Sequence, residues 1–286
     1  MPARLATRPL LAVSGIAGFA TISLLSLFLF FDPLAAKAAA GCALTKSERL
    51  KVRSVVDGDT LVLDDGREVR LVGTQAPKLP LGRKNFPTWP LAPEAADKLG
   101  AMTSGQMVTL KYGGARIDRH GRVLAHLFLD DGTWVQRAMV AAGLARFYSF
   151  ADNRKCASEL LAAEHDARAT RRGIWAVPYY DIRMAEDVAG LDKRVGTFQL
   201  VEGRVHDAEM IHGRLYLNFG SNWRDDFTVT VPPAGVKLFA KGAWAELIAT
   251  PSRLVGRKIR VRGWLDSFNG PQIEADHPEQ IEVLNQ

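Results

Sequence analysis

The chain has 286 residues, of which 47% are hydrophobic and 24% are charged, a composition typical of folded globular proteins. This balance excludes an intrinsically disordered or collagen-like chain, and the length favours two domains over one. Lysine and arginine outnumber aspartate and glutamate by 37 to 31, and the net charge of +6 permits an anionic partner without requiring one.

Residues 1–41 are typical of an export or anchor segment. Two arginines precede an uncharged run over residues 10–31, and an alanine-rich cluster follows at residues 35–41. The run is long enough to span a bilayer, which takes about 20 residues, whereas Ala-x-Ala patterns in the cluster favour cleavage. A cleaved signal peptide, a retained membrane anchor and a lipoprotein-type attachment at Cys42 remain open. In each case we expect residues 42–286 in the cell envelope, on the non-cytoplasmic side.

Short aliphatic runs separated by Asp-Gly turns predict antiparallel hairpins over residues 52–72. The turns are Asp57-Gly58 and Asp65-Gly66. Asp59 therefore lies at the start of one strand and Arg70 on its neighbour. We interpret this stretch as the region that carries the chemistry.

A proline-rich loop over residues 78–93 comes next, because its prolines disfavour both a helix interior and a central strand. It carries basic residues, so we expect it either to cover an anion or to be a solvated basic loop. Helices are predicted over residues 93–104, 133–142 and 157–172, and strands over residues 107–112 and 122–129.

The chain contains two cysteines, Cys42 and Cys156. Because an exported chain meets oxidising conditions, we predict a disulfide between them. The alternative is a buried free thiol at Cys156 with Cys42 acylated or removed.

Six motifs occur in order between residues 50 and 176. They are Asp57-Gly58-Asp59-Thr60, Arg70-Leu71 leading to Ala76-Pro77, Pro93-Glu94, Asp118-x-x-Gly-Arg122, Gly143-Leu144-Ala145 and Gly173-Ile174-Trp175. Their order and spacing resemble the staphylococcal-nuclease-like (thermonuclease) family. The resemblance implies a mainly β fold with helices (α+β), namely an OB-type β-barrel with three helices over residues 42–176.

The resemblance also implies roles for individual residues. In the family, calcium is held by two aspartates and a backbone carbonyl, two arginines grip the scissile phosphate, and a glutamate activates water. Carried over, the calcium ligands fall on Asp59, Gln75 and the Ala76 carbonyl, and the phosphate grip falls on Arg70 and Arg122. Lys78 stands where the family has its general base.

Two of these positions depart from the family pattern, because Gln75 replaces a metal carboxylate and Lys78 replaces the glutamate. Since calcium needs oxygen ligands and net negative charge, we expect calcium to be at most weakly bound. Asp57, Asp118 and His120 are supporting residues, and Glu94 and His120 are the alternative bases to consider.

Residues 177–195 are predicted as a linker, and residues 196–286 as a second domain. Strand-like runs occur at residues 198–205, 215–219, 227–231, 258–265 and 281–284, with a helix near residues 236–249. This pattern resembles a five-stranded OB-like barrel. Its aromatic residues are either core residues or base-stacking platforms for nucleic acid.

Three functions follow as hypotheses. The first is an exported nuclease that hydrolyses phosphodiesters with altered metal or base usage. The second is a catalytically degenerate envelope protein that binds nucleic acid or another polyanion, and the third is a two-barrel scaffold for a protein partner. The membrane is a partner if the N-terminal segment is retained.

Overall fold

The computed structural model describes residues 42–284. The predicted export or anchor segment, residues 1–41, lies outside the described residues. Within the described part, no helix is both long and apolar enough to cross a membrane.

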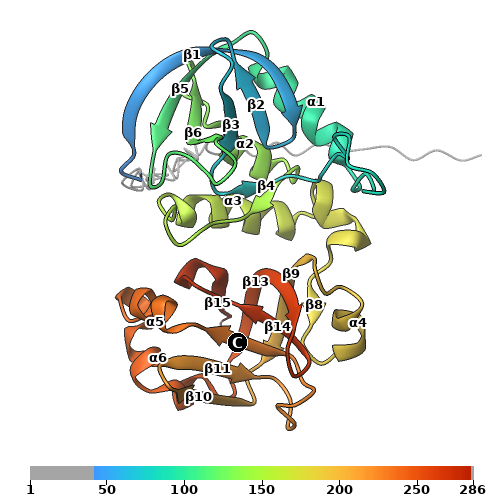
Figure 1. Cartoon of the computed structure of the whole chain (residues 1–286), viewed down its shortest axis with the longest axis vertical. Helices are drawn as coiled ribbons and strands as arrows, with labels where there is room; N and C mark the ends of the chain where they lie inside the picture. The colour runs from blue at the N-terminus through green and yellow to red at the C-terminus, as the bar shows by residue number, and fades with distance from the viewer. Residues whose placement is uncertain (1–41, 285–286) are drawn as a thin grey trace, which may run out of the picture. The chain divides into compact units, whose positions relative to one another are not determined.

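The N-terminal half contains a closed barrel of five strands in the order β1-β2-β3-β6-β5 (Figure 1). The strands are β1 (Thr45–Asp57), β2 (Thr60–Leu63), β3 (Glu68–Leu71), β5 (Met107–Tyr112) and β6 (Val123–Leu129). Register shifts along β1 bend it, so that this one strand pairs with both β2 and β5. Alternate residues of β3 and β5 point inward and are buried, as the two-residue strand period requires. The predicted OB-type barrel is confirmed.

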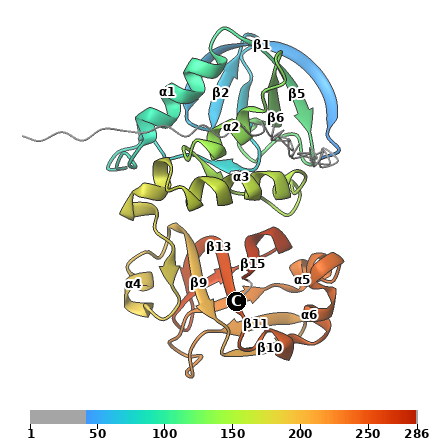
Figure 2. The ribbon, with the colours of Figure 1, turned by 180° about the vertical axis from the view of Figure 1, so that it is seen from behind.

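Three helices accompany the barrel, as predicted. They are α1 (Ala92–Thr103), α2 (Val135–Ala141) and α3 (Ala157–Ala169). Figure 2 shows α1 along the outside of the barrel. The segments after α2 and α3 approach closely at Gly143, where an added Cβ would lie 2.1 Å from the carbonyl oxygen of Arg172. Only glycine fits there.

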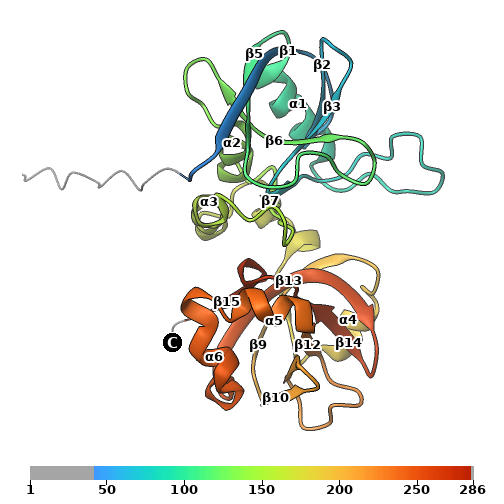
Figure 3. The ribbon, with the colours of Figure 1, turned by 60° about the vertical axis from the view of Figure 1, so that its left-hand side comes forward.

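A two-residue ladder joins β4 (Thr74–Gln75) to β7 (Arg146–Phe147). In Figure 3, β7 lies beside α3, which is seen nearly end-on. The register places Gln75 opposite Arg146. This short ladder therefore brings a predicted metal-ligand position against a residue 71 positions away in the chain.

Cys42 and Cys156 form a disulfide with a Cα–Cα distance of 5.1 Å, within the usual range. It closes a loop with a sequence separation of 114 residues. The bond ties the residues before β1 to the start of α3.

The C-terminal half contains an eight-stranded sheet in the order β10-β11-β12-β14-β13-β9-β8, with β15 also paired to β13. Its strands are β8 (Arg183–Met184), β9 (Phe198–Arg204), β10 (Asp207–Ile211), β11 (Arg214–Asn218), β12 (Thr228–Val231), β13 (Lys258–Ser267), β14 (Pro271–Glu274) and β15 (Ile281–Val283). The path ends at β10 and β8, and no pairing between these strands closes it in the described residues. The second barrel is therefore not confirmed.

Short helices complete this half. They are α4 (Val188–Asp192), α5 (Pro233–Phe239), α6 (Ala245–Ala249), and the 3₁₀ turns η1 (Gly173–Ala176), η2 (Pro178–Tyr180), η3 (Gly242–Trp244), η4 (Pro251–Leu254) and η5 (Pro278–Gln280). The predicted helix near residues 236–249 is thus two short helices separated by η3. Glycine at position 242 adopts φ of 68° there, a conformation that interrupts an α-helix.

The stretch predicted as a linker, residues 177–195, is structured. It contains η2, β8 and α4, and β8 pairs in parallel with β9. A small apolar cluster joins residues from both sides of it, including Trp175, Tyr180 and Phe198. The described residues, 42–284, belong to one compact unit. Independent folding of residues 196–286 stays a prediction.

Candidate active site

The candidate site begins at the turn between β1 and β2. Thr60 pairs with Arg70 across the β2–β3 ladder, which brings the neighbouring Asp59 close to Arg70. Gly58 lies so close to α1 that an added Cβ would be 2.6 Å from the Cβ of Ala95. A side chain at position 58 would push the turn away from the helix, so glycine is required for the position of both aspartates.

Lys78 lies directly against these aspartates. Its Nζ is 2.7 Å from each carboxylate oxygen of Asp59 and 3.2 Å from Oδ2 of Asp57. The Lys78 side chain is 19% exposed, whereas that of Asp59 is fully buried. Lys78, which stands at the family's general-base position, is therefore an ion-pair partner of Asp59, the first predicted metal ligand.

The Asp59 carboxylate also accepts hydrogen bonds from other groups of the protein. Its Oδ2 accepts a hydrogen bond from the backbone N–H of Ala76 at 2.7 Å, and its Oδ1 accepts one from the Thr60 hydroxyl at 3.2 Å. Arg70 NH2 approaches Oδ2 at 3.2 Å. Both oxygens of this carboxylate are thus committed within the protein.

The two aspartates have opposite pKa shifts. Burial by itself raises the pKa of Asp59, but Arg70 and Lys78 outweigh it and hold that pKa well below its usual range. The pKa of Asp57 is raised, first by burial and then by the negative charge of Asp59. Asp57 also accepts the backbone N–H of Asp59 at 3.0 Å, which fixes the turn.

The Arg70 guanidinium donates its hydrogen bonds mainly to backbone carbonyls. Its NH1 donates to the carbonyl of Leu71 at 2.9 Å, and its NH2 donates to the carbonyl of Thr74 at 2.6 Å. Its side chain is 12% exposed. A phosphate would have to compete with these acceptors, so this half of the predicted phosphate grip is not preformed.

The carboxamide of Gln75 is held by Arg146, a residue that the sequence reasoning missed. Arg146 donates to Gln75 Oε1 from Nε at 2.9 Å and from NH2 at 2.6 Å. Burial lowers the pKa of Arg146 to about 10. Its position directly after Gly143-Leu144-Ala145 was the available signal, but only the β4–β7 ladder shows that it faces Gln75.

Arg122, Asp118 and His120 form a separate group on the turn before β6. Asp118 Oδ2 accepts from Arg122 Nε at 2.8 Å, and Asp118 Oδ1 accepts the backbone N–H of His120 at 2.8 Å. Burial raises the pKa of Asp118, but its bonds from Arg122 and His120 lower it overall. Within the described residues, no hydrogen bond or ion pair joins this group to Asp59.

The two alternative bases are both exposed. Glu94 lies in the first turn of α1, where a carboxylate complements the helix dipole. His120 Nε2 is 3.1 Å from Arg119 Nε. Neither contacts Asp57 or Asp59 in the part of the chain that the structure describes.

Calcium does not fit these residues. The charges of Asp57 and Asp59 are balanced by those of Arg70 and Lys78, whereas calcium sites need net negative charge and several free oxygen ligands. The oxygen of Gln75 points to Arg146. Among the described residues, no group of three or more histidine, cysteine, aspartate or glutamate side chains could hold a metal ion.

Comparisons with known proteins agree with this fold. The family model "Staphylococcal nuclease homologue" matches residues 68–177, a span that includes Arg70, Gln75, Lys78 and Arg122 but not Asp59. The chain is similar to a thermonuclease of Staphylococcus hyicus, with 30% identity over 141 residues that cover 48% of this chain and 82% of the relative. It is also similar to an uncharacterized endonuclease of Escherichia coli, with 30% identity over 129 residues that cover 44% of this chain and 76% of the relative. The chain therefore belongs to the staphylococcal nuclease homologue family.

Proposed function

We propose that this protein is an exported, nucleic-acid-binding member of the nuclease family in which calcium-dependent cleavage is absent or strongly reduced. The observation that carries the proposal is the contact of Lys78 Nζ with both carboxylate oxygens of Asp59, each at 2.7 Å. An ammonium in this place supplies the positive charge that a metal would otherwise bring. It also removes the carboxylate that would serve as general base.

Nucleic acid is the proposed partner because the relatives are named thermonuclease and endonuclease. Exposed cations on two loops support an anionic partner, namely Arg83 and Lys84 before α1 and Arg116 and Arg119 before β6. Contacts of this kind bind phosphates with little sequence preference and weaken with added salt.

Cleavage assays of the full chain with DNA and RNA, with and without calcium, provide the first test. We expect little or no calcium-dependent cleavage. Robust calcium-dependent cleavage by the unmodified protein would overturn the proposal and would require a base other than Lys78.

Restoring the family's acids provides a sharper test. The double change Gln75→Asp plus Lys78→Glu should raise calcium-dependent cleavage by about 10²- to 10⁴-fold, the usual contribution of a placed general base. Either single change should do much less, because metal and base act together. Adding Arg70→Ala should abolish the gain.

Arg146 sets a further condition on this experiment. A carboxylate at position 75 would meet the guanidinium that now holds the Gln75 oxygen at 2.6 Å, and would be neutralised by it. We therefore expect the largest gain when Arg146→Gln is added to the double change. A folded triple variant without any gain would count against the family geometry at this site.

Binding of a labelled oligonucleotide distinguishes a catalytically degenerate protein that binds nucleic acid from a scaffold for a protein partner. We expect affinity that falls steeply between about 50 and 200 mM salt. Arg119→Glu should weaken it, whereas Arg253→Glu, at an exposed position in the other half of the chain, serves as the matched control.

Export is the remaining element of the proposal, and its support is the sequence of residues 1–41. A reporter that is active only outside the cytoplasm, fused after Gln286, tests it. Activity of a cytoplasm-only reporter in the same place would contradict export.

A further inference from the structure

A second group of reactive side chains lies apart from the nuclease-like site. Ser149 follows β7, and Asp276 and His277 lie between β14 and η5. The Ser149 hydroxyl is 2.6 Å from His277 Nε2, and His277 Nδ1 is 2.5 Å from Asp276 Oδ1. One buried imidazole thus links a serine hydroxyl to a carboxylate.

The two contacts favour one tautomer of a neutral His277 ring. A carboxylate accepts only, so Nδ1 carries the proton, and a neutral ring leaves Nε2 free to accept the Ser149 proton. This is the arrangement in which a serine is activated by a general base that a carboxylate orients. The His277 side chain is 1% exposed, whereas Ser149 is half-buried.

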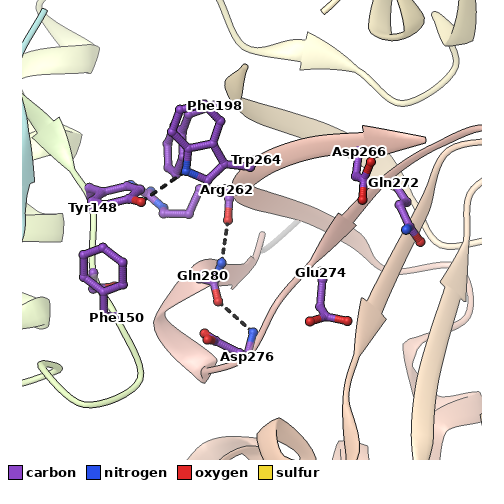
Figure 4. A pocket seen from close by; sticks show the side chains of 12 residues that line it. Tyr148, Phe150, Phe198, Arg262, Trp264, Asp266, Gln272, Glu274, Asp276 and Gln280 are labelled. Carbon is purple, nitrogen blue, oxygen red and sulfur yellow. Dashed lines mark hydrogen bonds between the residues drawn. The ribbon is translucent and has the colours of Figure 1, made fainter. Parts of the chain in front are cut away.

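The two segments that supply these residues are clamped together. Arg154 and Glu279 form a bidentate ion pair at 2.7 and 2.8 Å. Trp264 Nε1 donates to the Tyr148 hydroxyl at 3.1 Å (Figure 4). Contacts on both sides of the group therefore hold Ser149 against His277, as a preorganised site requires.

Ser149 and Asp276 line a cavity of about 360 Å³. The aromatic side chains Tyr148, Phe198 and Trp264 gather at one side of it, with Phe150 close by (Figure 4). A wall of this kind accommodates an apolar or aromatic group.

The charge around the cavity restricts the ligand. Asp266, Glu274 and Asp276 line it, and Glu274 is ion-paired with Arg214 at 2.6 Å. The cationic residue of the lining, Arg262, is bound to Glu164 and Glu282. Anionic substrates, including phosphodiesters, are disfavoured by the carboxylates of Asp266 and Asp276. Neutral or cationic molecules are favoured.

We propose that Ser149, His277 and Asp276 form a second catalytic site that hydrolyses small neutral or cationic carboxylic esters. Ser149 Oγ attacks the ester carbonyl carbon while His277 Nε2 takes the hydroxyl proton. The ester C–O bond then breaks, and the alcohol leaves with the proton from Nε2. Water hydrolyses the acyl-serine by the same steps and restores Ser149. Asp276 is a positioning residue, which holds Nδ1–H.

An alkyl fluorophosphonate probe tests the proposal on the full chain. We expect one adduct by intact mass, mapped to Ser149, and none in the Ser149→Ala variant. Ser158→Ala is the matched control, because the Ser158 hydroxyl donates to Glu159 and has no histidine partner in the described part of the chain. Asp276→Asn should slow labelling by about 10²-fold or more, whereas Asp276→Glu should retain part of the rate.

Esters give a second measurement. The protein should hydrolyse 4-nitrophenyl acetate in a Ser149-dependent way and should discriminate against an anionic ester such as mono-4-nitrophenyl glutarate. If Ser149→Ala does not fold, Ser149→Cys replaces it, and iodoacetamide should alkylate that thiol faster than in Ser149→Cys plus Asp276→Asn.

Absence of an adduct at Ser149 in folded protein would overturn the proposal, as would labelling that is insensitive to Asp276→Asn. Either result would identify the three residues as a structural hydrogen-bond chain only. The nuclease assays are independent of this outcome, because none of these residues contacts Asp59, Arg70 or Lys78.

Discussion

Two buried clusters in this protein consist of carboxylates paired with lysine or arginine, but they differ in their surroundings. The first, at the nuclease-like site, consists of Asp57, Asp59, Arg70 and Lys78. The second joins α3 to the C-terminal sheet and consists of Glu164, Arg262 and Glu282, with Arg168 and Arg260 beside them. In the first cluster the cations keep some contact with water, since the side chains of Lys78 and Arg70 are 19% and 12% exposed.

The second cluster is sealed at its centre. The side chains of Glu164 and Arg262 are 0% and 1% exposed, and Glu164 also accepts the backbone N–H of Phe147 at 2.6 Å. Burial lowers the pKa of Arg262, but Glu164 and Glu282 outweigh it and raise it overall. The exposure of the central cation thus separates the two clusters, since the Lys78 side chain is 19% exposed and that of Arg262 is 1% exposed. We expect the first cluster to exchange this cation for a ligand and the second to hold two parts of the chain together.

Removing the centre of the sealed cluster should have the largest effect on stability. Arg262→Met removes the cation that contacts both carboxylate oxygens of the buried Glu164 and leaves it with Arg168 at one of them. Breaking a buried ion pair in this way typically costs about 3–5 kcal/mol of unfolding free energy. Urea denaturation measures it. Adding Glu164→Leu should recover much of the loss, because the buried carboxylate is then removed as well.

The exposed pair Arg253–Glu246 is the matched control for that experiment. Its side chains are 53% and 79% exposed, so Arg253→Met should cost no more than about 1 kcal/mol. If Arg262→Met were as stable as this control, the second cluster would not hold the two parts of the chain together.

His126 extends the comparison, because it is a buried titratable group with no ion-pair partner among the residues that the structure describes. Neither ring nitrogen has a hydrogen-bond partner in the described residues, and burial lowers its pKa to about 4. The unfolded chain therefore binds a proton that the folded chain rejects between about pH 6.5 and 4. Stability should fall by about 3 kcal/mol as pH drops through this window and should be unaffected by His126 above it.

Denaturation of the wild type and of His126→Leu across pH 4 to 8 tests this expectation. The difference between the two proteins should grow in favour of the variant as pH falls below about 6.5. A constant difference at all pH values would mean that His126 is charged, or solvated, in the folded protein.

Replacing Lys78 should have the smallest effect on stability. It should allow calcium to take the place of the lysine ammonium. Lys78→Met leaves Asp59 with Arg70, the Thr60 hydroxyl and the Ala76 N–H, but gives the cluster a net negative charge. We expect calcium to stabilise this variant by about 1 kcal/mol at a concentration a few times its Kd, and to leave the wild type unchanged. Thermal unfolding with and without calcium measures it.

Arg262→Met provides the control here, since the central carboxylate of the second cluster, Glu164, is 0% exposed and calcium cannot reach it. An equal calcium response in the wild type and in Lys78→Met would contradict the view that the lysine occupies the cation position.

The sequence by itself determined the local elements and the family. Asp-Gly turns, alternating aliphatic residues and proline or glycine at helix ends act over a few positions, so the barrel strands and three helices of residues 42–176 could be predicted. The motif order predicted Asp59, Arg70, Gln75 and Lys78 as site positions, and it showed the two replacements, Gln75 and Lys78, on which the expectation of weak calcium binding rests.

Tertiary structure alone decided how those positions are used. Lys78 lies 19 positions from Asp59, Arg146 lies 71 from Gln75, and Arg262 lies 98 from Glu164. No local pattern specifies such pairs, because each depends on strand register and on burial, which makes an unpaired charge costly. For the same reason the open C-terminal sheet and the meeting of Ser149 with His277, 128 positions away, could not be predicted.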